Sequence, residues 1–532
     1  MKRLLLFGLV VAAVGLGVAG GSAASSTLCV GGPHCFSTIQ AALNAAHDGD
    51  TIQIGPGTFA GGVTITKSIN LVGAGATLTV IKGGGPVLTV GTFGAETEPT
   101  VSIDGMTITG GSTTSSAESV AFDGAPGVLA LGGGIEVPPN ADTSGGANVT
   151  ISDTIVAGNR AAPTATVPSP SGAQCPGNTI CPFARGAGGG IDTWGDLTLR
   201  NSVVSGNQVG GPVASSAEGG GISSHVGLLT VTNSVITGNQ ATASAPNGRN
   251  PNGGGINIDS GSFDMTSSSV VDNSTTLAAG LPSFVQMEAG GGGIFVSENA
   301  TAASISNTMI LRNSATMTNS VGDATAFSGG LHTNITIALS NDTLAGNHVN
   351  ATTLPGSTGN ADGSSGAGEI NGTFRNIQLI GNTVTVRSAA GIASAEGGAS
   401  IWDGGSITNG VIDGNHVDVS SPSGSVSVSG GGIFAAVDLS LSGSTVRGNT
   451  VVATGPSGTV FGGGIYDVAF PFGPDGPPGG PLVLQNSALT NNVLAASAGV
   501  TRQGGGLYTQ GEPLTLTGSV IARNVPDQCF GC

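Results

Sequence analysis

Two groups of side chains in this sequence combine residue types that could bind or act on a sugar chain. The first group is Asp192, Trp194, His225, Asn257 and Asp259. The second group is His332, Glu369, Asn371, Trp402 and Asp403. Carboxylates beside an aromatic ring could serve as acid and base on a glycosidic bond, and a flat ring could stack on a sugar.

Within these groups, Asp192, Asp259 and Glu369 are the candidate catalytic residues. Asp192 and Asp259 lie two repeats apart, which predicts a separation of roughly 9–10 Å along a stack of parallel strands. That distance is at the upper end of the range found in inverting glycosidases. Glu369 stands where nine of the eleven repeats carry Gly. The competing interpretation, which the sequence favours, is that these are solvated acids on a polar face.

A repeat must position these side chains. Each unit has a run of small residues, an anchoring aliphatic residue and, further on, a hydrophobic residue followed three positions later by Asn. The anchoring residues are Ile135, Ile191, Ile222, Ile256, Ile294, Leu331, Ile370, Ile401, Ile433, Ile465 and Leu507. The asparagines run from Asn159 to Asn524, mostly 32 to 35 residues apart. A fixed period in this range is the signature of a solenoid.

Short alternating stretches within one unit predict three strands per coil. In residues 188–209 they are Ile191–Thr193, Leu197–Leu199 and Val203–Val204, separated by turn-forming pairs. Coils stacked about 4.8 Å apart would place each Asn above the next, with side-chain amides bonded along a ladder. Asn would also take the left-handed conformation at the corner. The predicted fold class is all-β, a single-stranded parallel β-helix.

The N-terminal part predicts a cap and the boundaries of three segments. Ser37-Thr38-Ile39-Gln40 is a capping box that opens a short helix from Thr38 to Ala46. Its apolar face would cover the open end of the rod. We expect a signal peptide at residues 1–24, the cap and first coils at residues 25–131, and the eleven-repeat β-helix at residues 132–532.

Several features indicate export. Lys2-Arg3, an apolar run and small residues up to Ala24 are typical of a secretory signal peptide, with a membrane anchor as the competing interpretation. The six cysteines form three local pairs, which we expect to be disulfides: Cys29 with Cys35, Cys175 with Cys181, and Cys529 with Cys532. These pairs lie too far apart along a rod for a zinc site. We expect no metal, no cofactor and no membrane span after signal removal.

The charge of the chain limits its partners. The formal net charge is −17, which argues against nucleic acid, anionic lipid and acidic polysaccharides. A polysaccharide or cell-surface glycan that is neutral or weakly charged stays compatible with this charge.

Residues 39–81 (IQAALNAAHDGDTIQIGPGTFAGGVTITKSINLVGAGATLTVI) resemble the opening of pectin-lyase-like right-handed parallel β-helix proteins. Residues 132–524 look like secreted bacterial β-helix repeat proteins, with units similar to polymorphic outer membrane protein repeats. Here Gly-Gly-Gly-Ile replaces Gly-Gly-Ala-aliphatic, and Val/Ile/Leu-x-x-Asn replaces Phe-x-x-Asn. The resemblance implies a right-handed coil but no particular activity, because this fold hosts many functions. Asn257-Ile258-Asp259 is similar to an element of polygalacturonases, whose other catalytic motifs are missing.

One outward face would collect the candidate binding residues. If the anchoring residue faces inward, the residues one and three positions later face outward. The candidate binding residues are Trp194, His225, Asn257, His332, Asn371, Trp402, Asp403, Tyr466 and Tyr508. Their rings would stack on a neutral glycan along a glycine-lined groove; the alternative is an ordinary amphipathic strand face.

The leading hypothesis is therefore a secreted, non-catalytic β-helix that binds carbohydrate or another surface, as an adhesin does. One alternative is a polysaccharide lyase or glycoside hydrolase that acts on a neutral or weakly charged glycan. The other is a structural surface rod with no defined ligand. Whether the protein is an enzyme stays open at this point.

Overall fold

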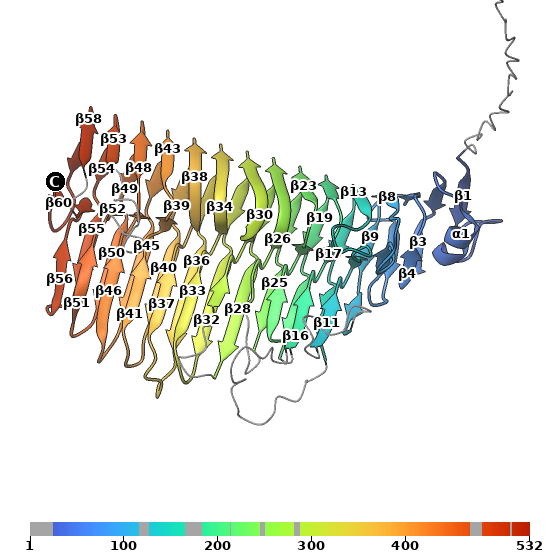
Figure 1. Ribbon diagram of the computed structural model, residues 1–532, viewed down its shortest axis with the longest axis horizontal. Helices are drawn as coiled ribbons and strands as arrows, with labels where there is room; N and C mark the ends of the chain where they lie inside the picture. The colour runs from blue at the N-terminus through green and yellow to red at the C-terminus, as the bar shows by residue number, and fades with distance from the viewer. Residues whose placement is uncertain are drawn as a thin grey trace, which may run out of the picture.

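The computed structural model describes residues 25–115, 127–164, 183–212, 214–244, 250–280, 288–468, 481–510 and 513–532. They form a rod of stacked coils, built almost entirely from parallel strands (Figure 1). Each strand pairs with its equivalent one coil further along, so the predicted all-β parallel β-helix is confirmed. The expected signal peptide and the Cys175–Cys181 pair lie outside the described residues.

A coil contains five strands where the sequence predicted three. In one coil they are β16 (Phe183–Ala187), β17 (Ile191–Thr193), β18 (Leu197–Arg200), β19 (Val203–Ser205) and β20 (Gln208–Gly211). The three middle strands match the prediction. The outer two come from the segment between the Asn and the next glycine run, where small apolar residues alternate with polar ones. This alternation is typical of a strand with one buried face.

The two additional strands create a second core. Ile191, Leu199 and Val204 are fully buried in the main core, which the β17-, β18- and β19-type strands enclose. Val349 of β36 (His348–Thr353) and Ala361 of β37 (Ala361–Ser364) belong to a separate apolar cluster. Burial of one Val side chain stabilises the fold by about 1.5–3 kcal/mol. The additional strand pair is therefore held by its own apolar contacts.

The glycine runs lie between the two cores and are buried. Gly188 has a φ of +59°, which side chains disfavour. A Cβ added at Gly189 would lie 2.6 Å from the carbonyl carbon of Gln208 and 2.5 Å from the oxygen of Gly220. The glycine run therefore packs directly against the backbone that leads into β20, and a side chain at Gly189 would not fit between them.

The predicted amide ladder is confirmed. The side-chain Nδ2 of Asn239 donates to Oδ1 of Asn273 at 2.9 Å and to the carbonyl of Val204 at 3.0 Å. Oδ1 of Asn239 accepts from both the backbone N–H and Nδ2 of Asn207 at 3.0 Å. At this corner the left-handed residue is Gly238, with a φ of +64°, and not Asn239. The predicted left-handed Asn occurs at another corner, at Asn201 (φ +48°) and Asn233 (φ +49°). The Asn is thus selected by its amide bonds, and the residue before it makes the turn.

The predicted capping helix is present, but the predicted capping box of Ser37 with Gln40 is wrong, because the N-cap is Thr38 and the Gln40 side chain donates to the carbonyl of Thr64. Helix α1 (Ile39–Ala45) begins after Thr38, whose side chain accepts the N–H of Ala41, and its apolar residues are buried against the first coils (Figure 1). The disulfides Cys29–Cys35 and Cys529–Cys532 are formed as predicted. No helix within the described ranges is long and apolar enough to cross a membrane.

Replacing Asn239 with Leu should lower the free energy of unfolding by about 1–3 kcal/mol, because the buried N–H of Asn207 loses its acceptor. The matched control is Asn148→Leu on β13 (Asn148–Ser152), where the side chain is exposed. This control should change the free energy by less than about 0.5 kcal/mol. Calorimetric melting of both variants checks the prediction, and equal shifts would contradict the role of the ladder.

Candidate functional site

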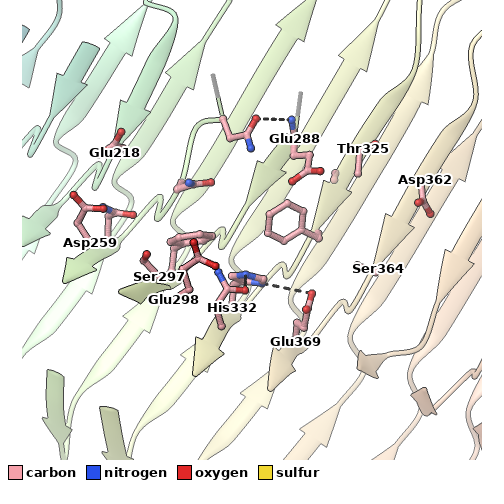
Figure 2. A pocket seen from close by; sticks show the side chains of 17 residues that line it. Glu218, Asp259, Glu288, Ser297, Glu298, Thr325, His332, Asp362, Ser364 and Glu369 are labelled. Carbon is pink, nitrogen blue, oxygen red and sulfur yellow. Dashed lines mark hydrogen bonds and ion pairs between the residues drawn. The ribbon is translucent and has the colours of Figure 1, made fainter. Parts of the chain in front are cut away.

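An elongated groove of about 550 Å³ runs across five consecutive coils in the middle of the rod (Figure 2). The first wall is the outward face of β26 (Ile256–Thr266), β30 (Ile294–Ser306), β34 (Leu331–Ser340) and β38 (Gly368–Arg375). The second wall is the outward face of β21 (Ser216–Glu218), β29 (Glu288–Gly290), β33 (Ala324–Phe327) and β37. The two walls meet at the glycine runs.

The second wall was not predicted, and it changes the exposure of the first. Asp192 is fully buried, His225 is 2% exposed and Tyr466 is 8% exposed. The three strands predicted for each coil do not include the strand that forms the second wall, and without that strand these residues would face solvent. The second wall therefore covers the predicted face, and only part of that face, including Asn257, Asp259 and His332, opens into the groove.

The register of two coils also differs from the prediction. Leu331 pairs with Gly368, and Gly368 pairs with Ala399, so these small residues replace Ile370 and Ile401 in the anchoring column. A slip of two residues leaves the same faces inward, so alternation alone could not exclude it. Glu369 therefore lies beside His332 on the next strand.

The structure brings the first predicted group into contact. Nε2 of His225 lies 2.9 Å from Oδ1 of Asp192, and Nδ1 of His225 lies 3.5 Å from Oδ2 of Asp259. The indole of Trp194 stacks on the imidazole with ring centroids 4.7 Å apart. The imidazole thus contacts both carboxylates, and the fully buried carboxylate of Asp192 fixes the position of the His225 ring.

The charges of this cluster compensate one another. Burial alone would lower the pKa of His225, but Asp192 and Asp259 more than offset it and raise the pKa to about 9. Arg185 of β16 forms an ion pair with Glu218 and lies 4.0 Å from Oδ2 of Asp259. Burial would raise the pKa of Asp259, yet His225 and Arg185 bring it below its usual value. At neutral pH, His225 and Arg185 are therefore cations held among carboxylates.

His332 of the second group is neutral at physiological pH. Its ring lies between those of Phe295 and Phe327, with centroids 4.8 Å and 4.7 Å away. Burial lowers its pKa to about 4. Nε2 lies 3.0 Å from Oδ1 of Asn334, which fixes the ring within the groove.

Glu369 reaches into the groove beside this histidine. Its Oε2 lies 3.6 Å from Nδ1 of His332 (Figure 2). Burial, followed by the charges of Glu288 and Asp403, raises the pKa of Glu369 to about 7. This carboxyl group therefore holds or releases a proton near neutral pH.

The other predicted residues of this face have structural contacts outside the lined groove. Oδ1 of Asn371 accepts the backbone N–H groups of Trp402 at 2.8 Å and Asp403 at 3.0 Å. The ring of Trp402 packs against Phe434 with centroids 5.0 Å apart. Asn371 thus stabilises the turn at Trp402 and Asp403, and the ring of Trp402 contributes an apolar contact.

Aromatic rings from both walls fill the space beyond the groove. Tyr466 stacks on Tyr508 with centroids 5.2 Å apart, and Phe461 of the second wall's continuation stacks on Tyr508 at 4.5 Å. Since the rings cover one another's faces, the faces of Tyr466 and Tyr508 are not open to a sugar.

Sequence reasoning missed the residues of the second wall. They are Arg185, Glu218, Glu288, Phe327, Asp362 and Glu396. The signal that could have found them is the alternation directly before each glycine run, as in Ala-Thr-Ala-Phe at residues 324–327. Among the described residues, no group of three His, Cys, Asp or Glu side chains is arranged to hold a metal ion.

Comparisons with known proteins add little. No protein-family model and no curated protein matches this chain. Among solved structures, it is similar to the A-module of a mannuronan C-5 epimerase from Azotobacter vinelandii. The identity is 14% and the TM-score 0.28, over 90% of this chain and 94% of that one. A TM-score this low supports no inference about activity.

The stability of the fold should depend on the proton of His225. Its pKa rises from 6.5 to about 9 on folding, so the charged form stabilises fully below the unfolded pKa, and this contribution is lost as pH rises through 9. The melting temperature of the wild type should therefore fall between about pH 6 and pH 10 more steeply than that of His225→Gln. Scanning calorimetry across this range checks the prediction, and parallel profiles for the two proteins would contradict it.

Proposed function

We propose that this protein is exported and binds a linear carbohydrate chain in the groove, as an adhesin-like surface-binding protein. The observation that carries the proposal is the shape and lining of the groove. It extends over five coils along the rod, and both walls present carboxylate, amide and hydroxyl groups. Such groups form hydrogen bonds with sugar hydroxyls, and a groove along the rod suits an extended polymer.

Two amides in the groove support this proposal. Asn257 is 3% exposed and lines the groove, and its side-chain amide makes no hydrogen bond with the described residues. Oδ1 of Asn252, which also lines the groove, is buried without a hydrogen-bond partner among them. A buried polar group without a partner costs about 1–3 kcal/mol. Ligand hydroxyl groups would remove that cost.

Export is part of the same proposal. The local disulfides Cys29–Cys35 and Cys529–Cys532 fit an oxidising compartment, as does the signal-like segment at residues 1–24. Relationship to secreted β-helix repeat proteins of the pectin-lyase-like type is proposed on the repeat pattern alone.

A glycan array followed by titration calorimetry tests the binding. Asn257→Ala should weaken the best ligand about two- to tenfold, because one hydrogen bond contributes about 0.5–1.5 kcal/mol. The control Asn148→Ala, at an exposed position away from the groove, should stay within about twofold. If no glycan binds, the structural-rod interpretation replaces the proposal.

A second candidate function, cleavage of the bound glycan by hydrolysis or elimination, is favoured by Glu369. A carboxyl group with a pKa of about 7 in a groove suits proton donation to the oxygen of a glycosidic bond. Asp259 is the further candidate, since its half-exposed carboxylate lines the same groove.

Product analysis on every bound glycan tests this candidate. If cleavage occurs, Glu369→Gln should lower its rate at least about 100-fold and leave binding in place. The matched variant Glu298→Gln removes another groove carboxyl and should keep cleavage. The wild-type rate should fall as pH rises through about 7, where Glu369 loses its proton. If the wild type forms no product, the cleavage candidate is rejected and only the binding proposal stands.

A further inference from the structure

The lining of the groove is strongly acidic, and only the carboxyl groups of Glu218 and Asp259 have a compensating cation beside them. Six carboxyl groups line it: Glu218, Asp259, Glu288, Glu298, Asp362 and Glu369. No Lys or Arg occurs among the described residues that line it. His332 is neutral, and the nearby Arg185 is held by Glu218 and Asp259.

The acids beyond Arg185 form a row along the rod. Glu288 pairs in register with Thr325, and Thr325 pairs with Asp362. The carboxyls of Glu288 and Asp362 thus stand two coils apart on the second wall, at a spacing of roughly 9–10 Å. Glu369 projects from the first wall in the same coil as Asp362 (Figure 2).

These acids disfavour one another's charge. Burial, followed by the charge of Asp362, raises the pKa of Glu288, and burial also raises the pKa of Asp362. Burial raises the pKa of Glu396 to about 8, with further contributions from Asp362 and Glu369. A neutral glycan would leave this repulsion in place, whereas an ammonium group would remove it.

Building on the proposed function, we infer that the groove takes a glycan that carries ammonium groups, an amino-sugar polymer. The repeated carboxyls along the second wall would each accept a charge-assisted hydrogen bond from an ammonium group. Oδ1 of Asn252, which is buried without a hydrogen-bond partner among the described residues, and the buried side chain of Asn257 line the same groove and would bond the hydroxyls. Those amides favour a chain with hydroxyl groups over a lysine-rich peptide. The aliphatic part of a lysine side chain cannot form hydrogen bonds with them, whereas a sugar hydroxyl can.

The test compares hexamers of equal length by titration calorimetry at about pH 6 and low salt: β-1,4-linked glucosamine, N-acetylglucosamine and glucose, together with hexalysine. The glucosamine hexamer should bind at least about tenfold more tightly than the other three, because charge-assisted hydrogen bonds are roughly twice as strong as neutral ones. Its affinity should fall as salt rises to about 0.5 M.

Variants assign the effect to the groove. The double variant Glu288→Gln and Asp362→Asn should weaken the glucosamine hexamer by at least about tenfold. The control Asp438→Asn removes an exposed charge outside the groove and should bind as the wild type does. Circular dichroism and melting temperatures establish that each variant is folded, so that a loss of affinity is read only from folded protein.

The outcomes separate the inference from the function on which it depends. Equal affinity for the three sugar hexamers would overturn the inference and leave carbohydrate binding standing. Hexalysine binding as tightly as glucosamine would overturn the choice of a glycan in favour of a basic peptide. If none of the hexamers binds, both the inference and the proposed function fail.

Discussion

The buried asparagine amides set the spacing on which the rest of this structure depends. From Asn207 onward, each Oδ1 accepts two N–H groups from the Asn one coil earlier, at 3.0 Å for the pair Asn207 and Asn239. A coil that slipped along its neighbour would break these bonds inside a dry core, where unsatisfied amides are costly. The ladder thus keeps all the remaining columns of side chains aligned, including the columns that line the groove.

The sequence predicted those parts of the fold that repeat at fixed offsets. The ladder, the short N-terminal helix and the two described disulfides follow from short patterns with a single physical explanation. Other features depend on tertiary contact. Glycine rather than Asn makes the corner at Gly238, and Ile370 competes with Gly368 for the anchoring column because both face inward. Propensity cannot rank such alternatives, whereas packing against the neighbouring coil does.

The site shows the same division. Residues at equal offsets in neighbouring coils must be neighbours in space, so the contacts of His225 with Trp194 and Asp259 could be expected from the repeat. The second wall could not be expected in this way, because its strands follow segments of variable length. Without it, Glu369 looks like a solvated acid; with it, the same carboxyl group is partly desolvated and shares a groove with other acids. The burial of Glu369 and its acidic neighbours, rather than its residue type, suit this carboxyl group to proton transfer.

The aromatic stack of Phe461, Tyr466 and Tyr508 makes the two ends of the space between the walls different. These rings come from the continuations of both walls and stack on one another, and they lie in coils nearer the C-terminus than the last coil that lines the groove. The space between the two walls therefore changes along the rod, from carboxyl and amide groups in the groove to packed aromatic rings nearer the C-terminus. The two directions along the rod are chemically different, so a polymer bound as proposed would meet a different surface at each of its ends.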